Sequence, residues 1–105
     1  MEFNKIDNAV VKDFLGALQQ NNQQQFERLL SPEVRFTHNG QTDNIHQWAA
    51  TFFFCNNPAR FVSIDKAEAG TIWAQLVIDG SGTLPVKLSF TIVNNKVSAL
   101  DAGRQ

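Results

Sequence analysis

The apolar residues of this 105-residue chain change their prevailing period at Pro58. Before Pro58 most of them recur at steps of three and four, which is typical of amphipathic helices, and after it they alternate along the chain, which is typical of strands. A chain ordered in this way is predicted to be an α+β protein, with helices followed by an antiparallel sheet. It contains neither an internal repeat nor a linker, so residues 1–105 are expected to form a single domain.

Three helices are predicted before Pro58. The first covers residues 6–20 and carries its apolar side chains on one side. The second includes residues 26–30, which follow a stretch rich in glutamine and asparagine. The third covers residues 45–53, and its first free amide groups are expected to be capped by the side chain of Thr42 or Asp43.

The predicted strands fall on both sides of the third helix. A short strand alternates over residues 34–38 and ends at Asn39-Gly40. Four more follow Pro58, and the short turns between them make them antiparallel neighbours. Glycine and asparagine tolerate positive φ, so these residues mark the turns. The four strands are expected at 60–68, 71–79, 84–93 and 96–102, with turns at Ala69-Gly70, Gly80-Ser81-Gly82 and Asn94-Asn95.

The core is expected to be rich in phenylalanine. Phe14, Phe26, Phe36 and Phe52 come from the three helices and the first strand, and they are predicted to meet inside the protein. Cys55 ends the apolar run of the third helix and is expected to be a small buried residue, the usual role of a free cysteine. Because it is the only cysteine, an intrachain disulfide and a cysteine-built zinc site are excluded.

Neither face of the strand over 71–79 is plainly polar. Trp73 and Val77 lie on one face, opposite Ile72 and Leu76 on the other. One face is expected to pack against the helices. The other is expected to pack against a second copy of the chain, so a homodimer through the sheet is predicted.

Charge and hydropathy exclude several kinds of partner. The net charge is −1 and the nine basic residues are spread along the chain, so nucleic acid is not an expected partner. No apolar run approaches the ~20 residues that span a bilayer, and the first residues lack a secretory signal pattern. We therefore expect a cytoplasmic protein that does not enter a membrane. Two histidines, His38 and His46, without a third ligand predict no metal site.

Two segments carry a resemblance to a known family. Residues 26–36, Phe-Glu-Arg-Leu-Leu-Ser-Pro-Glu-Val-Arg-Phe, combine the end of a helix, a short loop and a strand, and residues 92–97, Ile-Val-Asn-Asn-Lys-Val, form a hairpin before the last strand. With the order of its elements, the chain resembles the nuclear transport factor 2-like superfamily, which includes ketosteroid isomerases and polyketide cyclase-like proteins. The resemblance implies a curved sheet wrapped into a cone around the three helices, with an apolar pocket inside and often a dimer through the sheet.

The resemblance does not imply the chemistry of a standard ketosteroid isomerase. The place of that enzyme's tyrosine is held by Phe14, and the place of its proton-shuttling carboxylate is held by His38. The second oxyanion donor, a carboxylic acid on the penultimate strand, has no counterpart in residues 86–93. Because those groups stabilise the transition state, steroid isomerisation by that mechanism is disfavoured.

His38 is the one candidate for acid or base catalysis. An imidazole that titrates near neutral pH can transfer a proton within a closed pocket. Asp101 is the first candidate to orient it, because Asp101 shares alternation parity with Val97 and Ala99, and Asp65 is the second. The alternative is that His38 only hydrogen-bonds a backbone carbonyl at the mouth of the pocket.

Three functions follow from these features. The first is a protein that binds a small apolar ligand within the cone. The second is a cofactor-independent isomerase, dehydratase or cyclase that uses His38, and the third is a homodimeric interaction module. Aromatic residues at helical or strand spacing either line a pocket or fill the core. The residues predicted to contact a ligand are Phe14, Leu18, Trp48, Phe52, Trp73 and Phe90.

Overall fold

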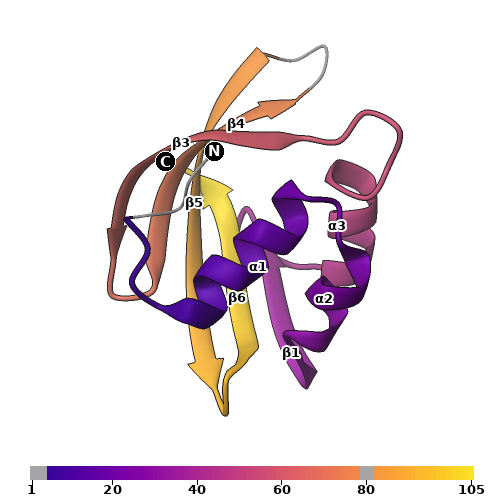
Figure 1. The fold of residues 1–105 in the computed structure, drawn as a ribbon, viewed down its shortest axis with the longest axis vertical. Coiled ribbons are helices and arrows are strands. Elements are labelled where there is room, and N and C mark those ends of the chain that lie inside the picture. The colour runs from indigo at the N-terminus through magenta and orange to yellow at the C-terminus, as the bar shows by residue number, and fades with distance from the viewer. Residues whose placement is uncertain (1–4, 79–81) are drawn as a thin grey trace.

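The computed structural model describes residues 5–78 and 82–105, and in it three helices lie against one face of a curved sheet of six strands (Figure 1). The predicted α+β class is confirmed. No helix in the described part of the chain is both long and apolar enough to cross a membrane. The elements are α1 Ala9–Gln19, α2 Gln23–Arg28, β1 Leu30–His38, β2 Gln41–Thr42, α3 Ile45–Phe52, β3 Arg60–Glu68, β4 Thr71–Ile78, β5 Gly82–Val93 and β6 Lys96–Arg104.

The strands follow the order β2-β1-β6-β5-β4-β3 across the sheet. As predicted, β3 to β6 are antiparallel neighbours. The expectation of an antiparallel sheet fails at one place, because β1 pairs with β6 in parallel, with Phe36 opposite Leu100 and His38 opposite Ala102. A parallel pair requires a long connection, and here α3 and four strands, β2 to β5, separate β1 from β6 in the chain.

The described hairpins turn at residues with positive φ. Asn94 and Asn95 adopt φ of 54° and 61°, and Ala69 and Gly70 adopt 52° and 83°. Two successive positive φ values match the right-handed twist of the flanking strands, so both predicted turns are confirmed. The turn predicted at Gly80-Ser81-Gly82 includes residues 79–81, which lie outside the described residues.

All three helices begin at an asparagine cap. Asn8, Asn22 and Asn44 each accept backbone amide hydrogens of the first helical turn through the side-chain oxygen. The predicted cap of the third helix is therefore wrong by one or two residues. Thr42 ends β2 instead, and the Asp43 carboxylate accepts from the backbone N–H of Asn44 at 2.7 Å.

The apolar side of α1 forms the centre of the core. The ring of Phe14 is fully buried and lies 5.2 Å from the ring of Phe26 and 5.3 Å from that of Phe90 on β5. Phe36 is buried as predicted, but Phe52 is only half-buried, and its neighbour Phe53 is the fully buried one. Phe53 is the C-cap residue of α3 and follows the buried residues Ile45 and Ala49 at steps of four, so it continues the buried side of the helix.

A bulge in β6 decides which residues face the helices. Ile92 pairs with Val97 while Thr91 pairs with Ala99, so one extra residue of β6 is inserted here. The alternation shifts, and Leu100 becomes buried in place of Ala99. Every later residue of β6 therefore lies on the face opposite to the one that simple alternation from Val97 predicts.

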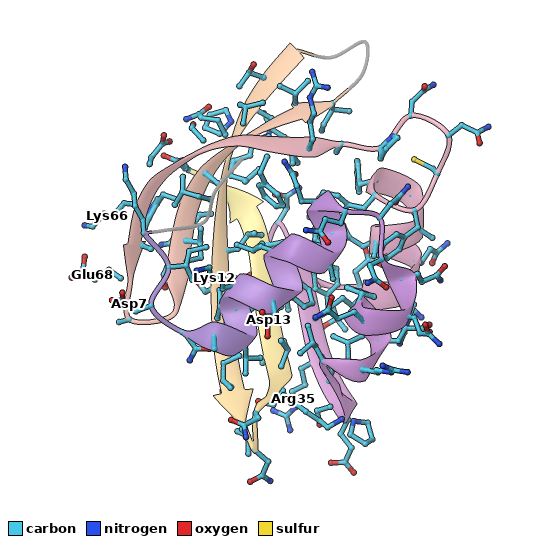
Figure 2. The ribbon with its side chains drawn as sticks, viewed as in Figure 1. Asp7, Lys12, Asp13, Arg35, Lys66 and Glu68 are labelled. Carbon is cyan, nitrogen blue, oxygen red and sulfur yellow. The ribbon has the colours of Figure 1, made fainter. Side chains whose placement is uncertain are left out.

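The outer face of the sheet is mixed in character. The ring of Trp73 lies under two ammonium groups, with Lys66 Nζ at 5.0 Å and Lys87 Nζ at 5.6 Å from its centre. Charged side chains such as Lys66 and Glu68 lie at the surface (Figure 2). Cys55 is exposed in the loop after α3, so the expectation that it is buried was wrong. The homodimer through this face stays a prediction.

Truncation of Phe36 tests the placement of β1. The ring is 3% exposed and lies 5.1 Å from the ring of Trp48 on α3. Its replacement in Phe36→Ala is expected to lower the free energy of unfolding by about 3 to 5 kcal/mol, because the surrounding side chains only partly fill the space that the ring leaves. The control Val62→Thr, at a side chain that is 46% exposed, is expected to change it by less than about 0.5 kcal/mol. Urea denaturation measures both, and an unchanged midpoint for Phe36→Ala contradicts the placement.

Candidate functional site

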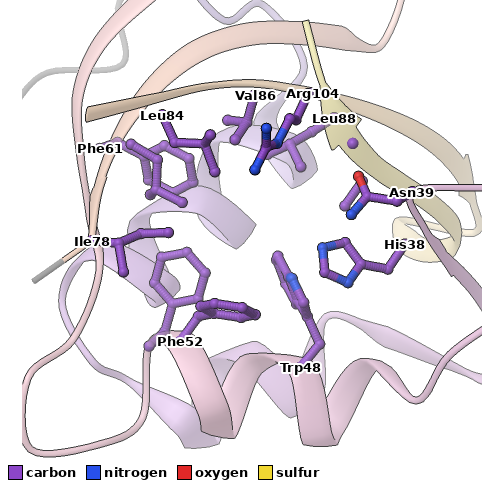
Figure 3. A pocket seen from close by; sticks show the side chains of 14 residues that line it. His38, Asn39, Trp48, Phe52, Phe61, Ile78, Leu84, Val86, Leu88 and Arg104 are labelled. Atoms are coloured by element: carbon purple, nitrogen blue, oxygen red, sulfur yellow. The ribbon is translucent and has the colours of Figure 1, made fainter. Parts of the chain in front are cut away.

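A cavity of about 240 Å³ lies between α3 and the inner face of the sheet. No described residue of α1 lines it, because the aromatic ring of this helix, Phe14, packs against Phe26 and Phe90 in the core. Figure 3 shows side chains from α3, from the end of β1 and from β3 to β6 around this space. The described residues that line it are His38, Asn39, Trp48, Phe52, Phe53, Phe61, Leu76, Ile78, Leu84, Val86, Leu88, Ala102, Gly103 and Arg104.

The cavity is apolar over most of its wall and polar at one end. Phe52, Phe61 and Ile78 lie together on one side of it, whereas His38 and Asn39 lie on the opposite side (Figure 3). An apolar pocket with a few converging polar groups is the usual form of a small-molecule site. The polar end is the part of this wall that can form hydrogen bonds.

His38 and Asn39 are placed by the hairpin that joins β1 to β2. Asn39 and Gly40 take φ of 54° and 82°, which closes the turn, and the backbone N–H of Asn39 donates to the carbonyl oxygen of Ala102 at 2.8 Å. His38 is the last residue of β1 and lies beside Ala102 in the register. Its ring packs 6.2 Å from the ring of Phe36 and 6.2 Å from that of Phe52.

The carboxylate that lies near His38 is that of Asp43, and not that of either predicted partner, Asp101 or Asp65. Asp43 Oδ2 lies 3.9 Å from His38 Nδ1, which is longer than a hydrogen bond. The His38 side chain is 31% exposed, so it faces both the cavity and water. A hydrogen bond between the two side chains would require this distance to shorten.

The predicted partners of His38 lie elsewhere. Asp101 is exposed and accepts a hydrogen bond from Thr37 Oγ1 at 2.6 Å, because the bulge in β6 turns it to the outer face. Asp65 also lies on the outer face, where hydrogen bonds from Gln75 and then from Gln105 hold the pKa of its carboxyl below the ordinary value. Neither residue lines the cavity, so the expected pairing with His38 is corrected in both cases.

The predicted ligand contacts divide into three groups. Trp48 and Phe52 line the cavity. Phe14, Leu18 and Phe90 are buried in the core, where they contact other protein side chains, and they do not line the cavity. Trp73 lies on the outer face beneath two lysine ammonium groups. Strand spacing alone did not separate these three environments.

Sequence reasoning missed Asn39 and Arg104 at the polar end of the cavity. Asn39 was read only as a turn residue, although it follows His38 directly. Arg104 shares the inner face with Leu100 and Ala102. Simple alternation from Val97 places these even-numbered residues on the outer face, and only the bulge in β6 brings them inside. Among the described residues, no group of histidine, cysteine and carboxylate side chains could hold a metal ion.

Solved structures with the same architecture confirm the fold. A protein from Sphaerobacter thermophilus superposes with a TM-score of 0.76 at 9% identity, covering 96% of this chain and 97% of its own. A candidate ketosteroid isomerase from Kribbella flavida gives 0.72 at 13% identity, covering 93% of this chain and 76% of its own. An LEH-like epoxide hydrolase from M. tuberculosis gives 0.66 at 16% identity, covering 93% and 81%.

The chain has the nuclear transport factor 2-like fold. The same comparison includes an NTF2-like protein of unknown function from Cytophaga hutchinsonii. No protein-family model matches the sequence, and no curated protein is similar to it. The resemblance inferred from residues 26–36 and 92–97 is thus confirmed for the fold, and the chemistry of this nuclear transport factor 2-like chain must be argued from its own cavity.

Proposed function

We propose that this protein binds a small, largely apolar molecule in the cavity between α3 and the sheet. The observation that carries the proposal is the composition of the wall, in which four aromatic side chains and five aliphatic ones surround about 240 Å³. Apolar surface that a ligand covers is removed from water, and this stabilises the complex by roughly 25 cal/mol per Å². The aromatic residues of this set are Trp48, Phe52, Phe53 and Phe61, and the aliphatic ones are Leu76, Ile78, Leu84, Val86 and Leu88.

The size of the cavity limits the ligand. Its volume corresponds to roughly eight water molecules of liquid, and it lies below the roughly 300 to 1,000 Å³ of most ligand pockets. A four-ring steroid is too large to be enclosed fully in this space. Together with the absence of tyrosine from the sequence, this argues against a steroid substrate and favours a molecule of about eight to twelve non-hydrogen atoms.

A variant that fills the cavity tests the proposal. Ala102 is 3% exposed and its side chain faces the cavity from β6, so Ala102→Leu should occupy the space that the ligand needs. We expect 1-octanol to change the fluorescence of Trp48 in a saturable way in the native protein, and this change to be lost in Ala102→Leu.

The matched control is Ala99→Leu, the same chemical change on the opposite face of β6, which should bind 1-octanol as the native protein does. Val86→Phe fills the cavity from β5 and provides a second blocking variant should Ala102→Leu unfold. Retained binding in both folded blocking variants contradicts the proposal.

A second function is favoured by one specific observation, the placement of His38 at the cavity with Asp43 3.9 Å from its Nδ1. In this candidate, the imidazole removes a proton from the carbon next to a carbonyl group of the bound molecule, which leaves an enolate and an imidazolium. Asp43 holds the imidazolium, and the proton is returned to carbon in the reverse step. Two solved neighbours are described as a candidate isomerase and an epoxide hydrolase, which supports small-molecule chemistry in this fold.

Isotope exchange tests the catalytic candidate without knowledge of the natural substrate. In D₂O the returned proton is a deuteron, so 2-octanone should lose its α-proton NMR signals faster with the protein than with buffer. His38→Gln is expected to lower the exchange rate by about 100-fold or more, the contribution of one general base.

The control His46→Gln removes an exposed histidine of α3 that lies beside Glu27, outside the cavity. Its exchange rate should equal that of the native protein. An equal loss in the two variants, or no exchange above buffer, contradicts a catalytic role for His38 and leaves binding as the function.

A further inference from the structure

We infer that the ligand carries a carboxylate, which Arg104 binds at the polar end of the cavity; this inference rests on the proposed binding function. The charge of the wall leads to it. Arg104 is the one permanently charged side chain among the described residues of the lining, and none of the others is acidic. A cation placed against an apolar cavity favours a ligand with a negative head and an apolar body.

Arg104 is free to take such a ligand. Within residues 5–78 and 82–105, no carboxylate lies within ion-pair distance of its guanidinium. Figure 3 shows the guanidinium beside Val86 and Leu88, projecting toward the space that His38 and Asn39 border. An arginine in this position presents a planar fork of N–H groups that matches the two oxygens of a carboxylate.

The direction of Arg104 is set by the residue that follows it. Gln105 lies on the outer face, where its side-chain Nε2 donates to Asp65 Oδ2 at 3.2 Å and to the carbonyl oxygens of Ala74 and Val86 at 3.2 and 3.3 Å. Successive side chains of a strand point to opposite faces. By holding Gln105 outside, these bonds direct Arg104 to the inner face.

The surroundings of Arg104 suit a carboxylate that stays partly in water. Arg104 and Asn39 are both exposed, so a carboxylate between them keeps part of its contact with water. Complete removal of a charged group from water would be costly in an apolar site. The amide of Asn39, which lines the same cavity, can also donate hydrogen bonds. The apolar body then extends away from this end, toward Phe61 and Ile78, and is removed from water.

Head group and cavity size together define the ligand class as a monocarboxylate with an apolar body of about seven to ten carbons. Octanoate represents this class, and octanamide is a neutral molecule of nearly the same shape. We expect octanoate to bind about tenfold more tightly than octanamide, since hydrogen bonds to a charged group are stronger than those to a neutral one. Octylamine, which carries the opposite charge, is expected to bind more weakly than either.

The experiment measures the three affinities by fluorescence in a Trp73→Phe background. The chain has two tryptophans, and this substitution on the outer face leaves Trp48, which lines the cavity, as the only reporter. In Arg104→Gln the ratio between the octanoate and octanamide affinities should fall to within about twofold. The control Arg35→Gln removes an equal charge from an exposed position of β1, and it should keep the tenfold ratio.

The outcomes separate this inference from the proposed function. Equal binding of octanoate and octanamide to the native protein, or preference for octylamine, overturns the carboxylate inference while binding in the cavity stands. A tenfold ratio that survives in Arg104→Gln overturns the role of Arg104. If none of the three molecules binds, the proposed function fails together with the inference.

Discussion

The packing of α1 against the concave face of the sheet is the contact on which the rest of the structure depends. Phe14 joins α1 to α2 through Phe26 and to β5 through Phe90. At the end of α1, the side-chain amide of Gln19 donates to the carbonyl oxygen of Phe61 at 2.9 Å and accepts from its N–H at 2.8 Å. The helix therefore holds β3 and β5 at the same time, and it keeps the sheet curved over the core (Figure 1).

The cavity lies between α3 and the inner face of the sheet, and side chains from the end of β1 and from β3 to β6 also line it (Figure 3). Large side chains line this space, and two of them, Phe53 and Phe61, stack with their ring centres 5.7 Å apart. The backbone at the ends of β1 and β6 supplies the positions for His38, Asn39 and Arg104. A scaffold with a complete core thus carries an unfilled space with one polar end.

Local patterns predicted the elements well, and strand geometry explains where they failed. The period change at Pro58 and the asparagine turn at residues 94–95 located β3 to β6 to within a few residues. The site was harder, because a single inserted residue in β6 exchanges its two faces. That exchange moved Asp101 out of the site and Arg104 into it. Trp48 and Phe52 were found from helical spacing, which such a bulge does not disturb.

Solved proteins of this fold include a candidate isomerase, an epoxide hydrolase and a protein of unknown function, so the fold alone does not choose among functions. The cavity of this chain combines an apolar wall with an arginine, an asparagine and a histidine. The same apolar wall suits both proposed functions, binding and catalysis. A bound molecule with a carbonyl group next to His38 would be a substrate, and a molecule without one would only be bound.

The most direct test of this account is a crystal structure of the protein with 8-bromooctanoate, in which the anomalous signal of bromine locates the end of the chain. We expect one bromine site inside the cavity, in van der Waals contact with Phe61 and Ile78, and the carboxylate oxygens within hydrogen-bond distance of Arg104. Bromine on the outer face of the sheet, or bromine at Arg104 with the carboxylate at Phe61, would contradict the account.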